Sequence, residues 1–271
     1  MPELPEVETT RRGISPHVIG RRVERVIVRE RKLRWPITRR LEQSLPGQTF
    51  CRVGRRGKYL LLETAKGTAI LHLGMSGSLR IIDAAAPAAV HDHVDIVLDN
   101  GRCLRFKDPR RFGALLWTTR NPASHRLLSA LGPEPLSTDF TGQGLYAQSQ
   151  GRRLAIKSFL MDSKIVAGIG NIYANEALFM AGIHPQRPAG RVSLNRYERL
   201  AQAVRAVLSA SLRQGGTTLR DFINSEGRPG YFRQSLGVYG RTGNPCPRCG
   251  QPIRERRIGQ RSSFFCSACQ R

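Results

Sequence analysis

The chain has 271 residues, enough for one large domain or two modest ones with a buried core. It holds 44 Lys and Arg against 20 Asp and Glu, a formal net charge of +24, and its apolar content of 40% argues against disorder. Of the 44 basic residues, 38 are Arg. So large a positive charge implies a polyanionic partner, with nucleic acid as the first candidate and an anionic membrane as the second. No apolar run reaches the ~20 residues that cross a bilayer, and no signal-peptide pattern begins the chain. A reducing, cytosolic compartment is therefore expected.

The chain begins "MPELPEVETT", an acidic and proline-stiffened start for a basic protein. Glu3, Glu6 and Glu8 alternate here with Pro2 and Pro5. Taken alone, the three carboxylates have a simple explanation, because acidic residues favour the positive N-terminal end of a helix.

The pattern from about residue 22 to 118 is typical of β-strands. Short β-rich runs occupy residues 22–30, 58–65, 68–82, 92–99 and 102–107. Asn-Gly at 100–101 lies between two of these runs and predicts a tight hairpin. The runs predict an antiparallel sandwich, in which Cys51 and Cys103 are expected to be inert, packed thiols. Residues 132–140 read as the linker that closes this domain.

Beyond the linker the apolar period becomes helical. Ser193 is a candidate N-cap, Gly215 a C-terminal stop, and the stripe between them is expected to be core; it consists of Tyr197, Leu200, Ala201, Val204 and Leu208. Upstream, "GIGNIYANEALFMAG" predicts a helix that ends near Gly182. The free backbone N–H groups at its start favour a DNA phosphate. The stretch lacks the third glycine of a dinucleotide site and the Gly-Lys of a P-loop.

Four of the six cysteines lie near the C-terminus as "CPRC" and "CSAC". These are Cys246, Cys249, Cys266 and Cys269, with sixteen residues between the two pairs. The spacing indicates a four-cysteine zinc ribbon that binds one structural Zn²⁺ and leaves no open coordination position. Two disulfides or redox pairs are the alternative, which a reducing compartment disfavours. The intervening residues predict a β-hairpin that turns near Gly259 and carries arginines toward DNA, and the metal should supply the folding energy of so short a segment.

Several motifs together resemble bacterial formamidopyrimidine-DNA glycosylase of the Fpg/Nei family. They are "MPELPEVET", "LHLGMSGSLR", "HDHVD", "DPRRFG", "GIGNIYANE" and the terminal four-cysteine finger, and they follow in the family's order from Met1 to Arg271. The resemblance implies an α+β fold: an N-terminal antiparallel β-sandwich with an N-terminal helix, a helix–two-turn–helix domain and a C-terminal zinc-finger β-hairpin. The implied boundaries are 1–132 for the catalytic sandwich, 133–150 for a linker, 151–239 for the helical domain and 240–271 for the finger. A lesion-capping loop is expected at 217–232.

The resemblance also implies an activity in base-excision DNA repair. The family is a bifunctional DNA glycosylase and AP lyase that excises oxidised purines, 8-oxoguanine and formamidopyrimidines, from double-stranded DNA and then cleaves the strand by β,δ-elimination. A monomer is expected, in the cytoplasm of a bacterium and associated with the nucleoid through DNA.

The family chemistry gives the N-terminus its role. Removal of Met1 exposes the secondary amine of Pro2, which attacks C1′ of the damaged nucleotide and forms a cationic Schiff base. Glu3 resembles the general acid/base, and Glu6 is expected to support that geometry. Glu8 has no assigned chemistry.

Lys58 matches the family lysine that takes part in lesion handling and β-elimination. It stands out because the chain otherwise uses Arg, and a lysine ammonium loses its proton more readily. A phosphate-binding surface lysine is the alternative. Arg261 matches the finger arginine of the second elimination.

The remaining expected contacts are with DNA. Met75, Arg110 and Phe112 match the residues that fill the void left by a flipped nucleotide, although a Met and a Phe in strand context are more often core. His72, His91, Arg153, Lys157 and Asn171 map to DNA-contact positions. At residue 153 the chain departs from some family members, which carry Lys there.

Two other interpretations remain. The endonuclease VIII branch prefers oxidised pyrimidines, but Leu4 in "PELPE" and the "DPRRFG" motif favour the first branch. A non-catalytic zinc-ribbon DNA binder is the other, and it would not need a start that exposes Pro2 and Glu3.

Overall fold

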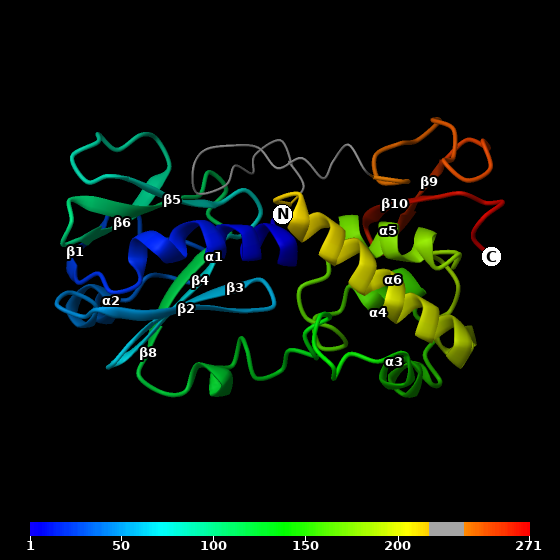
Figure 1. Ribbon diagram of the computed structural model, residues 1–271, viewed down its shortest axis with the longest axis horizontal. Coiled ribbons are helices and arrows are strands. Elements are labelled where there is room, and N and C mark those ends of the chain that lie inside the picture. Colours follow the sequence, from blue (N-terminus) through cyan, green and yellow to red (C-terminus); the bar gives the residue numbers. More distant parts are fainter. Residues whose placement is uncertain (217–235) are drawn as a thin grey trace. The chain divides into compact units, whose positions relative to one another are not determined.

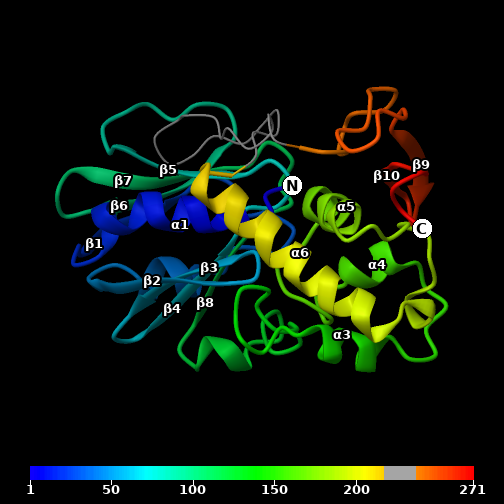
Figure 2. The same cartoon turned by 45° about the vertical axis from the view of Figure 1, so that its right-hand side comes forward.

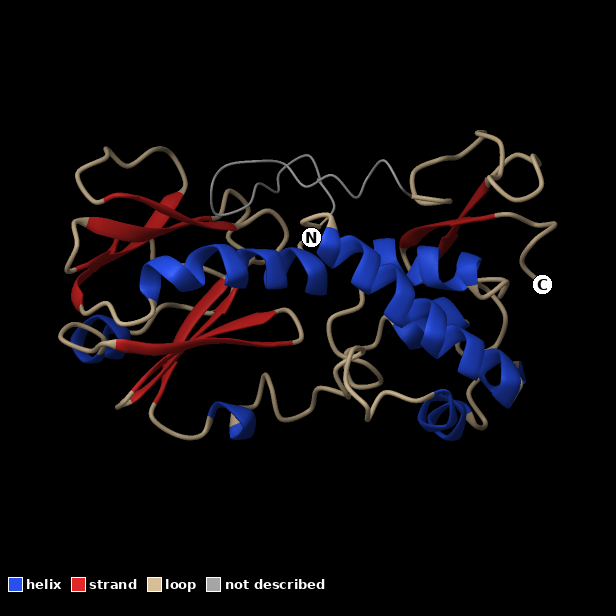
Figure 3. Cartoon of the chain, in the orientation of Figure 1, coloured by secondary structure: helices blue, strands red, loops and turns tan. Residues whose placement is uncertain are grey.

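The structure is a computed structural model that describes residues 1–216 and 236–271. The chain separates into two compact units. The first contains Met1–Ser129 with the described residues 214–216, and the second contains Ala130–Arg213 with residues 236–271. Figure 1 labels their elements, and Figure 3 shows that each unit contains both helices and strands. The predicted α+β class is confirmed. The predicted lesion-capping loop lies outside the described residues.

The first unit contains two four-stranded antiparallel sheets. One has the order β1 (Val23–Val28), β6 (Asp92–Leu98), β7 (Arg102–Lys107) and β5 (Ser78–Asp83). The other has the order β2 (Phe50–Arg56), β3 (Tyr59–Thr64), β4 (Gly67–His72) and β8 (Ala114–Thr118). The predicted antiparallel sandwich is therefore confirmed, although β2 and β8 were not among the predicted runs.

Helix α1 (Leu4–Val18) fixes the N-terminus against these sheets. It contacts β2, β3 and β5, and Figures 1 and 2 show it between the two sheets. Val7, Ile14 and Val18 on α1 are at most 1% exposed and belong to the same core as residues of both sheets. Burial of each such side chain contributes about 1.5–3 kcal/mol. The shorter elements of this unit are α2 (Arg39–Ser44) and the 3-10 helix η1 (Pro122–Ser124).

The β6–β7 hairpin forms at the predicted place, with a longer turn than the Asn-Gly pair suggests. Three residues connect the strands, and the Gly101 N–H donates to the Leu98 carbonyl at 3.2 Å. Only Gly101 takes a positive φ, 74°, whereas a two-residue type I′ turn needs two such residues.

The two cysteines of the sandwich differ. Cys103 is buried, as predicted. The prediction for Cys51 is wrong, because this residue is exposed. The pairing of β2 with β3 is irregular between Phe50 and Arg52, and the Cys51 thiol donates to the Glu63 carbonyl at 3.3 Å.

The second unit is helical with a terminal hairpin. Its elements are α3 (Gly142–Ser149), α4 (Ile156–Leu160), α5 (Asn171–Met180), η2 (Ala189–Arg191), α6 (Leu194–Arg213), β9 (Arg254–Ile258) and β10 (Arg261–Phe265). The predicted apolar stripe of α6 is buried, and α5 ends before Gly182 as predicted. The hairpin turns at Gly259 and Gln260, both with positive φ.

The segment expected as a linker, residues 133–150, contains helix α3. Its first residue, Gly142, lies directly against α6, since a Cβ there would meet the Glu198 backbone at 2.4 Å. Thr141 caps the helix by accepting the Gly144 N–H at 3.0 Å. Low helix propensity hid α3 in the sequence, and packing against α6 stabilises it.

Candidate functional site

The head of α1 holds two buried carboxylates beside Pro2. Glu3 is 2% exposed and Glu6 is fully buried. They form a capping box, in which the Glu3 side chain accepts the Glu6 N–H and the Glu6 carboxylate accepts the Glu3 N–H at 2.8 Å. Pro2 is buried as well and is joined to Met1 by an amide, whose nitrogen is not nucleophilic. Removal of Met1 would create a secondary amine at a rigid position.

The third carboxylate of the motif, Glu8, binds arginines. It accepts bonds from Arg11 at 2.8 and 2.9 Å, from Arg12 at 2.9 Å and from Arg55 at 3.1 Å. Burial raises the pKa of Glu8, but the arginine hydrogen bonds and charges outweigh burial and lower this pKa to about 2. The carboxylate therefore stays charged at neutral pH, which suits a structural anchor.

Lys58 lies in the turn between β2 and β3. The preceding residue, Gly57, has a φ of 55°. Its carbonyl accepts a hydrogen bond from Arg55 at 2.9 Å. The lysine thus belongs to a turn that is tied to α1 through Arg55 and Glu8.

His72 is on β4, opposite Tyr59 of β3, and the two ring centroids are 4.8 Å apart. Burial first, and then the charges of Lys58 and Arg34, lower the pKa of His72 to about 4. The imidazole is therefore neutral at pH 7. Its Nδ1 accepts the Gly74 N–H at 3.0 Å, so the neutral ring carries its proton on Nε2 and can donate it to an anion.

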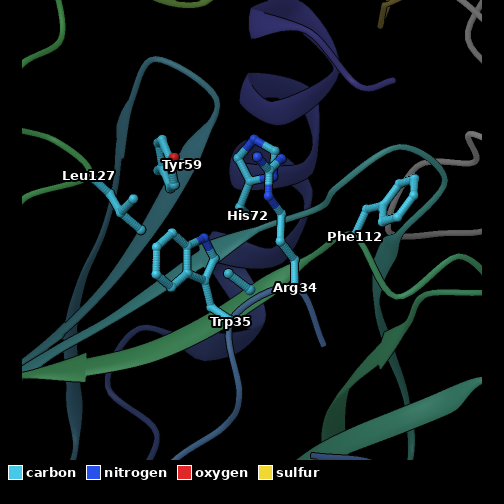
Figure 4. Close-up of a pocket in the computed structure, with 7 residues that line it drawn as sticks. Arg34, Trp35, Tyr59, His72, Phe112 and Leu127 are labelled. Carbon is cyan, nitrogen blue, oxygen red and sulfur yellow. The ribbon is translucent and has the colours of Figure 1, made fainter. Parts of the chain in front are cut away.

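His72 lines a pocket of about 130 Å³ in the first unit. Figure 4 shows the aromatic rings of Trp35 and Tyr59 on one side of His72, with Arg34 near the imidazole and Phe112 apart from the other labelled side chains. The lining combines aromatic rings with the hydrogen-bond donors of Arg34 and His72.

The "DPRRFG" loop between β7 and β8 presents Arg110 and Phe112. Phe112 is 43% exposed, so the alternative that it is a core residue is wrong. The Arg110 guanidinium lies 4.9 Å from the centre of the Phe112 ring. Asp108 is fully buried and accepts the Gly113 N–H at 2.7 Å, which fixes the end of the loop.

Two further expected DNA contacts lie in turns of the first unit. Met75 follows β4 and is half-buried. His91 precedes β6, is exposed and has a φ of 74°.

The second unit contains the remaining four expected residues. Arg153 and Arg261 are exposed. Asn171, at the first position of α5, donates to the Ser262 carbonyl at 3.1 Å. Lys157, also an expected DNA contact, is 1% exposed. Its ammonium donates within the protein, to Ser262 O at 2.7 Å and Ser263 Oγ at 2.6 Å.

Sequence reasoning missed two polar residues of α5 that anchor other segments. Asn175 accepts the Phe264 N–H at 2.8 Å and so holds β10. The Glu176 carboxylate accepts the N–H groups of residues 237, 238 and 239 at 2.8, 3.0 and 2.8 Å. Burial raises the pKa of Glu176 and these hydrogen bonds lower it, with a net increase. Two adjacent polar residues within a mostly apolar helix are the signal that could have identified them.

The four cysteines of the finger come together as predicted. Their sulfur atoms all lie within 4.8 Å of one another. Tetrahedral zinc with Zn–S bonds of ≈ 2.3 Å requires sulfur separations of about 3.8 Å. The Cys246–Cys269 and Cys249–Cys266 pairs, at 3.9 and 3.4 Å, fit one structural zinc ion held by four thiolates.

These features define a zinc-finger DNA-binding protein with a candidate nucleophile at Pro2. They are the β-sandwich with the buried Pro2, the helical unit and the four-cysteine hairpin. The chain belongs to the formamidopyrimidine-DNA glycosylase family. Its N-terminal domain model matches residues 1–115, its H2TH domain model matches residues 131–223, and a model described as a zinc finger found in FPG and IleRS matches residues 243–271.

Individual relatives cover the whole chain. A formamidopyrimidine-DNA glycosylase of Nitrosococcus oceani is 60% identical over 270 residues, 100% of both chains. The MutM (FPG) crystal structure from Thermus thermophilus has a TM-score of 0.90 at 39% identity and covers 99% of this chain and 98% of that one. A complex between Lactococcus lactis FPG (MutM) and Fapy-dG containing DNA has a TM-score of 0.91 at 30% identity and covers 99% and 100%.

Proposed function

We propose that this protein is a bifunctional DNA glycosylase and AP lyase of base-excision repair. Its substrate is double-stranded DNA that contains oxidised purines, 8-oxoguanine or formamidopyrimidines. The observation that carries the proposal is the buried Pro2–Glu3 pair at the head of α1, in a chain that belongs to this family over its full length. Related Lactococcus lactis proteins bind DNA with Fapy-dG or an abasic site.

In the proposed reaction the Pro2 nitrogen lone pair forms a bond to C1′, and the bond from C1′ to the base breaks with its electron pair. Glu3 is the proposed general acid, which delivers a proton to the departing group or the sugar oxygen. The nitrogen then loses its proton and the C1′–O4′ bond breaks, with O4′ taking up a proton, so that the opened sugar carries a C1′=N⁺ iminium. This cation acidifies the C2′ protons. Loss of one of them expels the 3′ phosphate, and a second elimination releases the 5′ phosphate.

Three other residues have proposed roles in these steps. The Glu6 carboxylate holds the N–H of Glu3, so its proposed role is positioning. Lys58 is the proposed acid/base for lesion handling and β-elimination. Arg261 is the proposed partner of the 3′ phosphate; because a guanidinium does not deprotonate in proteins, it acts through its charge.

Recognition of the duplex rests on exposed loops. Met75 and Phe112 are the proposed wedges into the base stack, and Arg110 the hydrogen-bond donor to the orphaned base. Flipping costs a few kcal/mol, which such contacts offset. The proposed phosphate contacts are His72, His91, Arg153 and Asn171. For Lys157, whose ammonium binds Ser262 and Ser263, we propose support of the finger next to Arg261.

The finger's zinc ion is structural, since its four ligands are all cysteines. None of the described helices is both long and apolar enough to span a membrane. We propose a monomer that acts in the cytoplasm on the nucleoid. The proposed functional parts remain residues 1–132, 151–239 and 240–271. Residues 133–150 connect the first part to the second.

Borohydride trapping tests the mechanism. The protein is mixed with a duplex that holds 8-oxoguanine opposite cytosine, reduced, and digested for mass spectrometry. We expect a covalent adduct on residue 2 and none with a Pro2→Gly variant whose terminus is acetylated. An adduct elsewhere, or none, contradicts the mechanism. Faster trapping on an oxidised pyrimidine would instead favour the endonuclease VIII branch.

A further inference from the structure

Three arginine side chains cluster around Glu8 in the first half of α1. Arg11 and Arg12 follow Glu8 on the same helix and bind its carboxylate as i,i+3 and i,i+4 partners. Arg55 comes from β2, 47 residues away in sequence. The Glu8 and Arg55 side chains are 11% and 13% exposed, so water screens this pair weakly.

Two of the contacts that Arg55 makes reach different parts of the first unit. Its Nε donates to Glu8 of α1 at 3.1 Å, and its Nη1 donates to the Gly57 carbonyl at 2.9 Å. Gly57 immediately precedes Lys58, and its φ of 55° makes this turn a specific conformation. One planar guanidinium therefore connects the helix that begins after Pro2 to the turn that carries Lys58.

We propose that Glu8 and Arg55 are positioning residues that hold Lys58 at a fixed place relative to the head of α1. The pair thereby sets the efficiency of the elimination steps relative to base excision. This inference rests on the roles of Pro2 and Lys58 in the proposed function.

The docking of α1 itself has other supports. Val7, Ile14 and Val18 bury the helix in the sandwich core, and Arg11 donates to the Val53 carbonyl of β2 at 3.2 Å. Loss of Arg55 would leave these contacts in place. It would remove the hydrogen bond to the Gly57 carbonyl, so we expect an effect on the position of Lys58.

The geometry of Arg55 suggests the variant. A guanidinium presents donors in a rigid fork, whereas a lysine ammonium is a single point on a flexible stem. Arg55→Lys keeps the positive charge beside Glu8 but cannot span both acceptors in the same way. Arg52→Lys is the matched control, since Arg52 lies on the same strand, is 71% exposed and pairs with Glu63 at 3.4 Å.

The experiment separates the two chemical steps. Base release and strand cleavage are measured in single turnover on a duplex with 8-oxoguanine, and cleavage is also measured on a duplex with a preformed abasic site. We expect Arg55→Lys and Glu8→Gln to slow strand cleavage roughly tenfold or more, because misplacement by about 1 Å can cost 10²-fold. Base release should change by less than about threefold. Arg52→Lys should leave both steps unchanged.

A double variant, Glu8→Gln with Arg55→Lys, tests whether the two residues act through one bridge. We expect it to slow cleavage no more than the stronger single variant does, since coupled residues are not additive. Equal slowing of both steps, or unchanged cleavage, would overturn the inference. If the wild-type protein forms no adduct at Pro2, the proposed function fails instead. Melting followed by the fluorescence of Trp35 and Trp117, both in the first unit, shows whether each variant is folded.

Discussion

Acidification should selectively remove the stabilisation that Glu8 contributes. This carboxylate has a pKa of about 2 in the folded protein, against 4.5 for an ordinary glutamate. Because folding lowers the pKa, the stabilisation is complete above about pH 5 and is lost as the pH falls toward 2. At ~1.4 kcal/mol for each factor of ten, the full effect is about 3 kcal/mol.

Much of this effect falls in an accessible pH range. With pKa values of about 4.5 unfolded and about 2 folded, linkage gives a loss of about 1.4 kcal/mol by pH 3.5 and almost none at pH 6. The wild-type protein loses this part of its free energy of unfolding at pH 3.5. The Glu8→Gln variant does not, because glutamine does not titrate.

The assay is urea unfolding of both proteins at pH 6 and pH 3.5, followed by tryptophan fluorescence. The only two tryptophans, Trp35 and Trp117, lie in the first unit with Glu8, so release of zinc from the second unit at low pH does not contribute directly. The quantity to compare is the free energy of unfolding of the wild type minus that of the variant. We expect this difference to be about 1.4 kcal/mol smaller at pH 3.5 than at pH 6.

A difference between the two proteins that stays constant with pH would refute the reasoning, since Glu8 would then titrate alike in the folded and unfolded chains. Glu63→Gln is the control. Its partner Arg52 is 71% exposed, and an exposed pair contributes about 0–1 kcal/mol.

Three other outcomes are expected. Cys249→Ser should lose zinc and DNA binding, as measured by metal analysis and a mobility shift, whereas exposed Cys51→Ser should keep both; retained zinc in the first variant would count against the ribbon. DNA affinity should fall steeply as salt rises, as phosphate contacts require, and a flat profile would contradict the DNA-binding role. Glu176→Gln should lower the stability of the second unit by about 1–3 kcal/mol, because an amide NH₂ replaces one of the two oxygens that together accept three backbone N–H groups and so leaves at least one N–H without its acceptor. Hydrogen exchange at residues 237–239 measures that loss, and unchanged protection there would show that the bonds matter little.

Features with local sequence signals were predictable. The spacing of the four cysteines placed the metal ligands because ligand geometry depends on short, fixed separations. Gly259 indicated the hairpin turn, and the stripe from Tyr197 to Leu208 indicated the buried face of α6. Each of these depends on residues within a few positions of one another.

Features stabilised by distant contacts were not predictable. Strand β2 carries a glycine and three arginines, and its contacts with α1 depend on Glu8 and Arg11. Lys157 was expected to contact DNA, and nothing near it in sequence indicated its burial, because Ser262 and Ser263, which bind its ammonium, are more than 100 residues away. The pairing is invisible until the fold brings α4 and the finger together.

The three carboxylates at the start of the chain, Glu3, Glu6 and Glu8, differ in their contacts. Glu6 closes the capping box by accepting the Glu3 N–H, and this fixes the backbone next to Pro2. Glu8 points to the arginines and remains ionised at neutral pH. Of the three residues, Glu3 is the one next to Pro2 in sequence, which supports its proposed role as the general acid. Glu6 and Glu8 have proposed positioning roles.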